Sequence, residues 1–259
     1  MSALGGQRVW LTGASSGIGA AVAAELTRRG AQVAITARRR ETLYQVAGET
    51  GMRVEVGDVT DEAAMARIAQ ALIADWGAID LVILNAGTYE PVTPDAFRAQ
   101  IFRTHFDVNV MGAVNCIQAV LPAMRARGAG RIAITSSVTG YVGLPLASAY
   151  GATKAFLNSM CDALRADLAS SGVKVTLIAP GFVRTPLTDQ NPFTMPGIIE
   201  ADEAARIICD GLQHDKAEIG VPRKALVFMK ALAMFPAPLR RWYVARIAGK
   251  RERDAGGLS

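Results

Sequence analysis

The strongest constraint on the fold is an alternation of short apolar runs with stretches of helical periodicity. The apolar runs are RVWLTG, AQVAITA, MRVEVGD, IDLVILNAG, GRIAITSS and VKVTLIAPG, and stretches such as AAVAAELTRRG and DEAAMARIAQALIADWG lie between them. Segments such as LVILN and VTLIAP are apolar at consecutive positions, which is typical of strands covered on both faces. The pattern predicts an α/β chain, a doubly wound parallel sheet flanked by helices and joined by right-handed crossovers.

Length and composition fit one domain with a substantial core. The chain has 259 residues, of which 51% are hydrophobic and 20% charged, as is typical of a globular protein. No internal repeat, low-complexity linker or break in composition precedes about residue 185. We predict a single domain over residues 1–222, with a substrate loop at about 186–200, followed by a basic amphipathic extension over residues 223–259.

The net positive charge of the chain comes from its C-terminal part. From Arg223 onward there are nine Lys or Arg and two acids, a balance of +7, whereas the whole chain carries +5 and residues 1–222 therefore carry −2. The body thus lacks the basic surface that nucleic-acid binding requires, and no nucleic-acid partner is expected.

The cysteines and histidines form no metal-binding pattern. Cys116, Cys161 and Cys209 stand far apart without a CxxC pair, and His105 and His214 are the only histidines. No metal site is therefore expected, and both histidines are interpreted as structural. An odd number of cysteines without a secretory leader favours a cytoplasmic location. No run approaches the roughly 18–20 apolar residues of a membrane-spanning helix.

The loop TGASSGIG follows the first predicted strand and contains Gly13, Gly17 and Gly19. At the carboxyl end of a strand, such glycines allow a sharp turn and the close approach of a pyrophosphate to the N–H groups of a helix that begins near Ile18. The spacing departs from the G-x-G-x-x-G dinucleotide fingerprint. A structural turn without a ligand therefore remains the alternative at this point.

The end of the second predicted strand indicates which dinucleotide would bind. An acid there would bind the ribose diol of NAD, whereas this chain has Ala37 followed by three arginines. Arg38 is best placed to hold a 2′-phosphate, because a guanidinium matches phosphate oxygens in a fork, and Arg40 is interpreted as solvated. The sequence therefore predicts NADP(H) as cofactor.

Further motifs follow in a fixed order along the chain. Tyr150 and Lys154 are four residues apart, and Ser137 precedes the tyrosine by thirteen positions. LNAG (84–87), DVNVMG (107–112) and PGFVRT (180–185) complete the series. Together with the glycine loop, these motifs resemble the short-chain dehydrogenase/reductase family over about residues 7–186. The resemblance implies a Rossmann-type fold and an oxidoreductase.

The same resemblance implies roles for individual residues. Tyr150 would donate its hydroxyl proton to a carbonyl, Lys154 would lower the pKa of Tyr150, Ser137 would bind the substrate oxygen, and Asn109 would hold a water that relays protons. The residues expected to contact the cofactor are Gly13, Ser15, Ser16, Gly17, Ile18, Gly19, Arg38, Asp58, Val59, Asn85, Ala86, Gly87, Tyr150, Lys154, Pro180, Gly181, Val183 and Thr185. Two positions depart from the family pattern. Leu84 stands where an Asn is frequent, and Ser16 stands where some NADP-using members have Arg or Lys, which leaves selectivity mainly to Arg38.

The substrate is expected to be neutral and apolar, because no charged residue is placed to bind a carboxylate or phosphate. The segment 186–200 could fold over it as a lid. The residues expected to contact the carbonyl or alcohol substrate are Ser137, Val138, Tyr141, Leu144, Tyr150, Phe182, Phe193 and Met195.

The C-terminal extension leaves several interpretations open. Its basic residues, with Trp242 and Tyr243, could contact an anionic membrane surface through residues 223–250, contact a lipid-like substrate, or pack on the body or on a partner subunit. The last residues, GKRERDAGGLS, are expected to be frayed. The family resemblance implies a homo-oligomer, dimer or tetramer, with helices near 95–127 and 150–170 at the interface. A non-catalytic NADP-binding or membrane-peripheral protein is the rival function.

Overall fold

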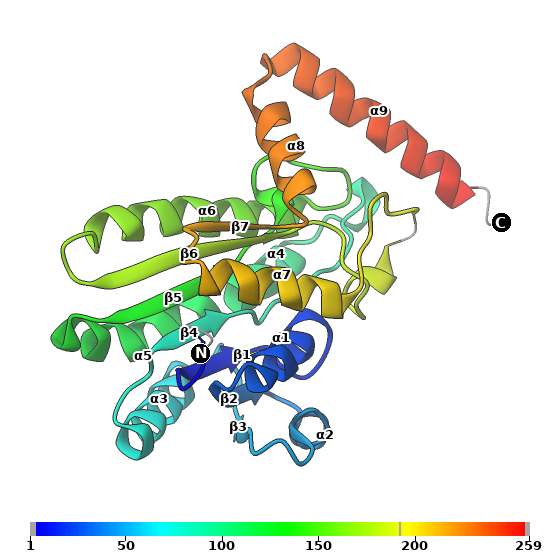
Figure 1. Cartoon of the computed structure of the whole chain (residues 1–259). Helices are drawn as coiled ribbons and strands as arrows, with labels where there is room; N and C mark the ends of the chain where they lie inside the picture. The colour runs from blue at the N-terminus through cyan, green and yellow to red at the C-terminus, as the bar shows by residue number, and fades with distance from the viewer. Residues whose placement is uncertain (1–3, 192, 257–259) are drawn as a thin grey trace.

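The fold is built on one parallel sheet of seven strands (Figure 1). Six of them lie in the predicted apolar runs, and the seventh, Glu218–Val221, was not predicted. The structure is a computed structural model and describes residues 4–191 and 193–256. The strand order is β3-β2-β1-β4-β5-β6-β7. The strands are β1 Arg8–Thr12, β2 Gln32–Ala37, β3 Arg53–Val56, β4 Leu81–Leu84, β5 Gly130–Thr135, β6 Val173–Pro180 and β7 Glu218–Val221.

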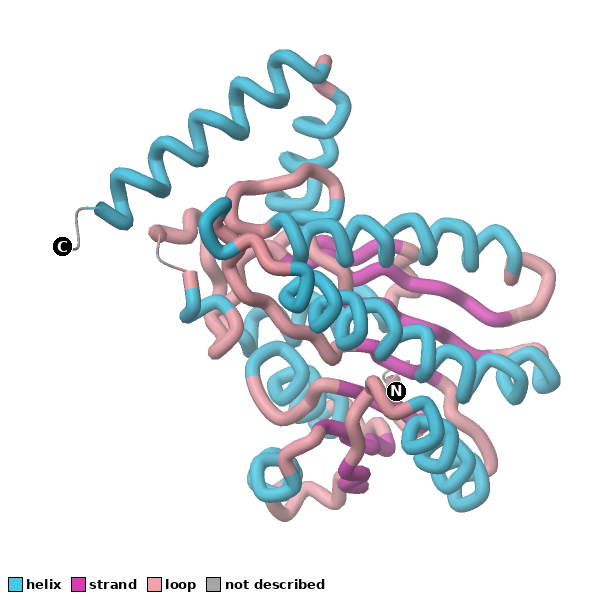
Figure 2. The backbone as a smooth tube through the Cα atoms, turned by 180° about the vertical axis from the view of Figure 1, so that it is seen from behind, coloured by secondary structure: helices cyan, strands magenta, loops and turns pink. Residues whose placement is uncertain are grey.

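Helices cover both faces of this sheet and complete a Rossmann-type domain (Figures 1 and 2). Helices α1 and α7 pack together on one face, and α3 and α5 pack together on the other. The helices are α1 Gly17–Arg28, α2 Arg40–Ala47, α3 Glu62–Trp76, α4 Ala99–Phe106, α5 Gly112–Arg127, α6 Ser148–Asp167, α7 Ala201–Gln213, α8 Arg223–Met234 and α9 Ala237–Gly256.

Two hydrophobic cores, one on each face, explain why the strands are apolar at consecutive positions. In β1, Val9 and Leu11 belong to the core under α1, α2 and α7. The intervening Trp10 belongs to the core under α3, α5 and α6. Successive side chains of a strand point to opposite faces, so a strand covered on both sides must be apolar throughout.

The strand order reverses between β1 and β4, and this reversal positions the site. From β1 the chain builds outward to β3 on one side, and from β4 it builds outward to β7 on the other. Leu11 pairs with Ile83 in the parallel register between them. The loops after β1 and β4 therefore leave the sheet side by side, at the edge where doubly wound sheets bind ligands.

The long helix 99–127 departs from the expectation that no segment is long and apolar enough to cross a membrane. Helix α4, a π-helical turn at Asp107–Met111 and α5 form one continuous helix, which meets that test by length and composition. The core helix of a soluble protein meets the same test, and 44% of its most apolar window is buried inside the fold.

The C-terminal extension is helical rather than frayed. Helix α8 follows β7 directly and packs on the body, and α9 turns back from the outer end of α8, with Tyr243 and Val244 packed against the same cluster (Figures 1 and 2). The expectation of a frayed end was wrong as far as Gly256, and residues 257–259 lie outside the described part of the chain, as do residues 1–3 and Pro192 within the predicted loop.

Candidate active site

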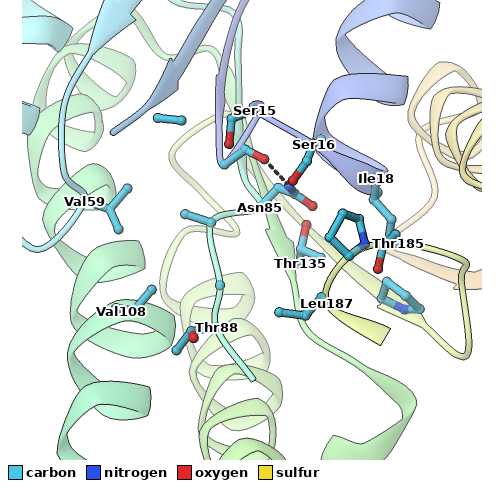
Figure 3. A pocket seen from close by; sticks show the side chains of 18 of the residues that line it. Ser15, Ser16, Ile18, Val59, Asn85, Thr88, Val108, Thr135, Thr185 and Leu187 are labelled. Carbon is cyan, nitrogen blue, oxygen red and sulfur yellow. Dashed lines mark hydrogen bonds between the residues drawn. The ribbon is translucent and has the colours of Figure 1, made fainter. Parts of the chain in front are cut away.

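A cavity of about 570 Å³ opens at the carboxyl ends of the strands, between the loops that follow β1 and β4. Every residue predicted to contact the cofactor lines it, and so do Ser137, Tyr150 and Lys154. Figure 3 shows Val59 and Val108 facing Ile18, Thr185 and Leu187 across the opening. The cavity also has lining residues that sequence reasoning missed, namely Ala37, Arg39, Gly57, Thr88, Thr104, Val108, Thr135, Ser136, Pro186, Leu187, Thr188 and Gln190.

Neighbouring backbone lies very close to the glycine loop. A Cβ atom on Gly13 would lie 2.6 Å from the Cα atom of Ala86, and one on Gly19 would lie 2.2 Å from the carbonyl oxygen of Gly13. Those two positions therefore require glycine because the backbone after β4 and the loop itself come so close. Gly17 has φ +55°, and a Cβ atom there would lie 2.9 Å from the Thr185 side chain. All three glycines line the cavity, and their role in holding a pyrophosphate stays a prediction.

Thr12 joins the two loops and was missed by sequence reasoning. Its Oγ1 atom accepts hydrogen bonds from the backbone N–H groups of Asn85 at 3.2 Å and Ala86 at 3.3 Å. In return, the Asn85 side-chain amide donates to the Gly13 carbonyl at 3.2 Å. The signal that could have identified Thr12 is its place as the last residue of β1, directly before Gly13.

The N-terminus of α1 is open to the cavity. Ser16 is the N-cap residue, yet its side chain makes no capping hydrogen bond, and Ser16, Gly17, Ile18 and Gly19 all line the cavity. The first N–H groups of a helix have no partner within that helix, and with the helix dipole they form an anion site. This end of α1 therefore suits a phosphate group.

Two arginines lie at the end of β2. Arg38 is 75% exposed, and its Nη1 atom is 4.0 Å from Oδ2 of Asp58. Arg39 also lines the cavity, and its Nη2 atom donates to the Ser15 hydroxyl at 3.5 Å. Sequence reasoning selected Arg38 alone, although Arg39 also lines the cavity and reaches Ser15.

The wall formed by Asp58 and Val59 is fixed by short polar contacts. Oδ1 of Asp58 accepts from the backbone N–H and the hydroxyl of Thr60, at 3.0 and 2.9 Å. The Asn115 amide donates to the Val59 carbonyl at 2.9 Å. A Cβ atom on Gly112 would lie 2.6 Å from the Val59 side chain, so α5 meets this wall closely.

Tyr150 and Lys154 lie on α6 and face Ser137 at the end of β5. Lys154 is only 3% exposed, and its Nζ atom donates to the Thr135 carbonyl at 2.9 Å. The same Nζ atom lies 5.4 Å from the centre of the Tyr150 ring. The Ser137 hydroxyl donates to the Pro180 carbonyl at 3.2 Å and accepts from the Thr139 N–H at 3.2 Å. The spacing of four residues thus brings hydroxyl and ammonium groups to one place, as helical periodicity requires.

Burial dominates the acid–base properties of this pair. Desolvation raises the pKa of Tyr150 to about 12, and the neighbouring Ser137 side chain has a smaller, lowering effect. Burial also lowers the pKa of Lys154 to about 8. The expectation that Lys154 lowers the pKa of Tyr150 concerns the complex with an oxidised cofactor and stays a prediction; in the protein alone, the loss of solvent is the dominant effect. Tyr150 carries its proton at neutral pH.

Asn109 is buried within the π-helical turn between α4 and α5. Its Oδ1 atom accepts from the Thr88 N–H at 2.7 Å, and its Nδ2 atom donates to the Thr88 carbonyl at 3.1 Å and to the Thr153 hydroxyl at 3.0 Å. Such turns are frequent at functional sites. The Asn109 side chain thus ties the loop after β4 to α6 and acts as a positioning residue, and its water-holding role stays a prediction.

Most residues predicted to bind substrate do not line the cavity. Val138, Tyr141 and Leu144 pack against α8 instead. The Tyr141 hydroxyl donates to Glu218, so its assignment to the substrate pocket is corrected. Of the others, Phe182 and Phe193 form an edge-to-face pair with centres 6.0 Å apart. Met195 accepts a hydrogen bond from the Asn191 amide at 3.3 Å.

Tyr89 contacts Tyr150 and was missed by sequence reasoning. Its ring meets the Tyr150 ring edge-on, with centres 5.2 Å apart. Its hydroxyl donates to the Asn191 side chain at 2.9 Å, and Asn191 belongs to the predicted substrate loop. The loop is also fixed at its base, because Arg184 N–H donates to the Ile199 carbonyl at 2.9 Å. Its role as a lid stays a prediction.

The histidine and cysteines outside the site have structural environments. His105 is 1% exposed, with one ring nitrogen 2.7 Å from the Ile101 carbonyl and the other 3.0 Å from the Glu90 N–H. Burial raises the pKa of the Cys116 thiol to about 12, which makes it unreactive. Among the described residues, no three His, Cys, Asp or Glu side chains form a metal-binding group.

Comparison with known proteins identifies the fold and the chemistry together. Residues 7–194 match the family model described as short chain dehydrogenase. The chain is a short-chain dehydrogenase/reductase. An oxidoreductase of Myxococcus xanthus, named only as uncharacterized, is 38% identical over 235 residues, which cover 88% of this chain and 92% of that protein. An oxidoreductase of Staphylococcus epidermidis, also named as uncharacterized, is 34% identical over 197 residues, which cover 75% of this chain and 86% of that protein.

Solved structures of short-chain dehydrogenases have the same architecture. The short-chain dehydrogenase of Streptomyces avermitilis superposes with a TM-score of 0.79 at 28% identity, over 93% of this chain and 98% of that one. A short-chain dehydrogenase/reductase of Burkholderia phymatum in complex with NAD gives a TM-score of 0.81 at 22% identity, over 89% of this chain and 94% of that one. This short-chain dehydrogenase/reductase is therefore an oxidoreductase with the Rossmann-type fold of its family.

Proposed function

We propose that this enzyme interconverts a carbonyl and an alcohol on a neutral, apolar substrate with NADP(H). The observation that carries the proposal is that Tyr150, Lys154 and Ser137 line the same cavity as the open N-terminus of α1 and the arginines after β2. One cavity thus offers a proton donor and an anion site, as a nicotinamide-dependent reductase requires.

The residues fit a nicotinamide dinucleotide. The N–H groups at the start of α1 would hold the pyrophosphate, and the wall at Asp58 and Val59 would face the adenine. When bound, the reduced cofactor supplies a hydride. Gly13 and Gly19 have no room for a Cβ atom even without a cofactor, because backbone atoms of this chain lie close to both positions.

Arg38 and Arg39 support the choice of NADP(H). Both line the cavity directly after β2, where an acid would instead bind the diol of NAD. A 2′-phosphate beside Ser15 would meet two guanidinium groups, each able to donate in a fork. The Burkholderia phymatum neighbour was solved with NAD, so within this family the selectivity of each chain rests on its own residues at this position.

Tyr150 would act as the proton donor in carbonyl reduction. Its pKa of about 12 keeps the hydroxyl protonated at neutral pH, and the proton would pass to the carbonyl oxygen as hydride reaches the carbon. The Ser137 side chain, which lines the same cavity as Tyr150, would hold that oxygen in place. Lys154, held by Thr135, would offset the negative charge that remains on the tyrosine.

A neutral substrate follows from the charges of the lining. Among the described residues that line the cavity, the charged ones are Arg38, Arg39, Asp58 and Lys154. The first three follow β2 and β3, which β1 and β4 separate from β5 and Ser137. At the Tyr150 end, the one charged lining residue is Lys154, which would offset the charge on Tyr150, so no further cation among these lining residues is left to pair with a substrate carboxylate.

The test is an NADPH-oxidation screen of the purified protein against aldehydes, aromatic and aliphatic ketones, steroids, retinoids and 3-oxoacyl thioesters. The proposal expects turnover of at least one neutral carbonyl with NADPH preferred to NADH. Tight NADPH binding without turnover of any of them would favour the rival, a non-catalytic NADP-binding protein.

We also propose a homo-oligomer that associates through α4, α5 and α6. Phe106 and Phe156 are 42% and 43% exposed and stack edge-to-face with ring centres 5.8 Å apart. Met111, between α4 and α5, is 39% exposed. Apolar side chains gathered on one surface are typical of a protein interface.

A further inference from the structure

The C-terminal helices α8 and α9 form a hairpin with an apolar tip. Around the turn between them, Met234 is 85% exposed, Phe235 and Leu239 are each 47% exposed, and Trp242 is 59% exposed. Four large apolar side chains within nine positions of one turn cost free energy in water. The tip therefore requires a partner.

The base of the hairpin is anchored to the body. Leu226, Met229 and Leu232 of α8 are buried against Val138 and Val142, which follow the catalytic Ser137. The amino end of α8 lies beside the cavity, because a Cβ atom on Gly181 would lie 3.1 Å from that of Ala225. The opposite end carries the tip away from the sheet (Figure 1). The tip thus has a fixed position relative to the active site.

The hairpin is strongly basic. Between Glu218 and Glu252 the sequence has eight Lys or Arg and no Asp or Glu. Of the cations described between 223 and 247, Lys230 pairs with Glu218. Arg240 and Arg241 directly follow Leu239, and Arg246 lies over the Trp242 ring at 5.8 Å. Cations therefore surround the apolar tip.

The exposed apolar side chains and the nearby cations together favour an anionic lipid surface over a second copy of this chain as the partner of the tip. A second copy of this chain seated symmetrically on the tip would bring cation against cation, which opposes association. An anionic bilayer offers phosphate groups to the arginines and a boundary region into which Trp and Phe insert readily. We propose that the tip formed by Met234, Phe235, Leu239 and Trp242 docks on an anionic lipid surface, with Arg240, Arg241 and Arg246 at the headgroups.

The direct test is co-sedimentation of the full chain with vesicles at 0.1 M salt. We expect binding to vesicles of phosphatidylcholine with phosphatidylglycerol, weaker binding to phosphatidylcholine alone, and a decrease as salt is raised. The double variant Met234→Glu/Trp242→Glu should stay in the supernatant, because charged side chains do not enter the boundary region.

A second variant tests the charge without altering the apolar tip. Arg241→Gln/Arg246→Gln should weaken binding by about fivefold per cation, or about 30-fold together, since each cation near an anionic surface contributes about 1 kcal/mol. The matched control Arg67→Gln/Arg125→Gln removes two exposed cations from α3 and α5 and should bind as the unaltered chain does. NADPH binding by every variant checks that the body is folded.

Two results would overturn the proposal. One is an unaltered chain that stays in the supernatant with anionic vesicles. The other is a control variant that loses as much binding as the tip variants do, since general positive charge would then explain it. If the Met234→Glu/Trp242→Glu variant instead becomes a smaller oligomer in solution while the unaltered chain ignores lipid, the tip is an interface between copies.

Discussion

At the scale of single residues, Tyr150 and Lys154 are buried next to each other, and their burial shifts the two pKa values in opposite directions. Burial disfavours the charged form of each group, so it raises the pKa of the phenol and lowers the pKa of the amine. The Tyr150 hydroxyl therefore keeps its proton at neutral pH, as a proton donor to a carbonyl must.

The lowered pKa of Lys154 predicts how stability depends on pH. Its pKa is about 8 in the folded chain and 10.5 when exposed, so between these values the unfolded chain binds more protons and the free energy of unfolding should rise with pH. We expect a gain of about 2 kcal/mol from this group between pH 8 and 10, partly offset above pH 10 as Tyr150 loses its proton in the unfolded chain. Urea unfolding at pH 8 and 10 measures it.

The control for that prediction is Lys154→Met, which has no titrating group at this position. Its free energy of unfolding should rise less between pH 8 and 10 than that of the unaltered chain. Equal rises in both proteins would show that Lys154 is not the group responsible.

Cofactor selectivity is a second property of single residues. Arg38→Asp should weaken NADPH binding by about 10- to 100-fold, because it removes charge-assisted hydrogen bonds to the 2′-phosphate, and should change NADH binding far less. The control is Arg40→Asp at the start of α2, which makes the same charge change. Titration of both cofactors by fluorescence measures the effect, and equal losses for NADPH and NADH would contradict the assignment.

At the scale of elements, the loops after β1 and β4 depend on each other. Gly19→Ala would place a Cβ atom 2.2 Å from the Gly13 carbonyl oxygen, so this substitution must displace backbone and should cost about 1–3 kcal/mol. That loss corresponds to a fall in Tm of several degrees, roughly 2–4 °C per kcal/mol. Gly143→Ala, where nothing lies within 4 Å, is the control and should leave Tm unchanged. An unaltered Tm for Gly19→Ala would contradict this account of the loop.

Local sequence patterns predict the elements but not their long-range partners. The apolar runs marked the strands, and the spacing of Tyr150 and Lys154 placed them on one helix face. The pairing of Thr12 with the backbone of Asn85 and Ala86 joins segments more than seventy residues apart, and nothing local encodes it. For the same reason, Tyr141 was wrongly assigned to the pocket and Tyr89 was missed, since their partners Glu218 and Asn191 come from distant parts of the chain.

At the scale of the whole molecule, the exposed surfaces divide between two tasks. Phe106, Met111 and Phe156 lie on the helices proposed to associate with another copy, whereas the apolar tip of α8 and α9 is proposed to meet lipid. Phe156→Glu should therefore lower the oligomeric state, because a charge at the centre of an apolar interface lacks a partner. Tyr44→Glu, at a more exposed aromatic residue on α2, is the control. Light scattering measures the mass, and an unchanged mass for Phe156→Glu would contradict this choice of interface.

The proposed enzyme reduces a carbonyl bound in this cavity, with Tyr150 as proton donor. The most direct measurement compares NADPH oxidation by Tyr150→Phe and Tyr89→Phe with the best substrate from the carbonyl screen. We predict that Tyr150→Phe lowers turnover by about 10²- to 10⁴-fold while NADPH still binds. Tyr89→Phe, which loses only the hydroxyl bound to Asn191, should stay active. Full activity of Tyr150→Phe would contradict the account.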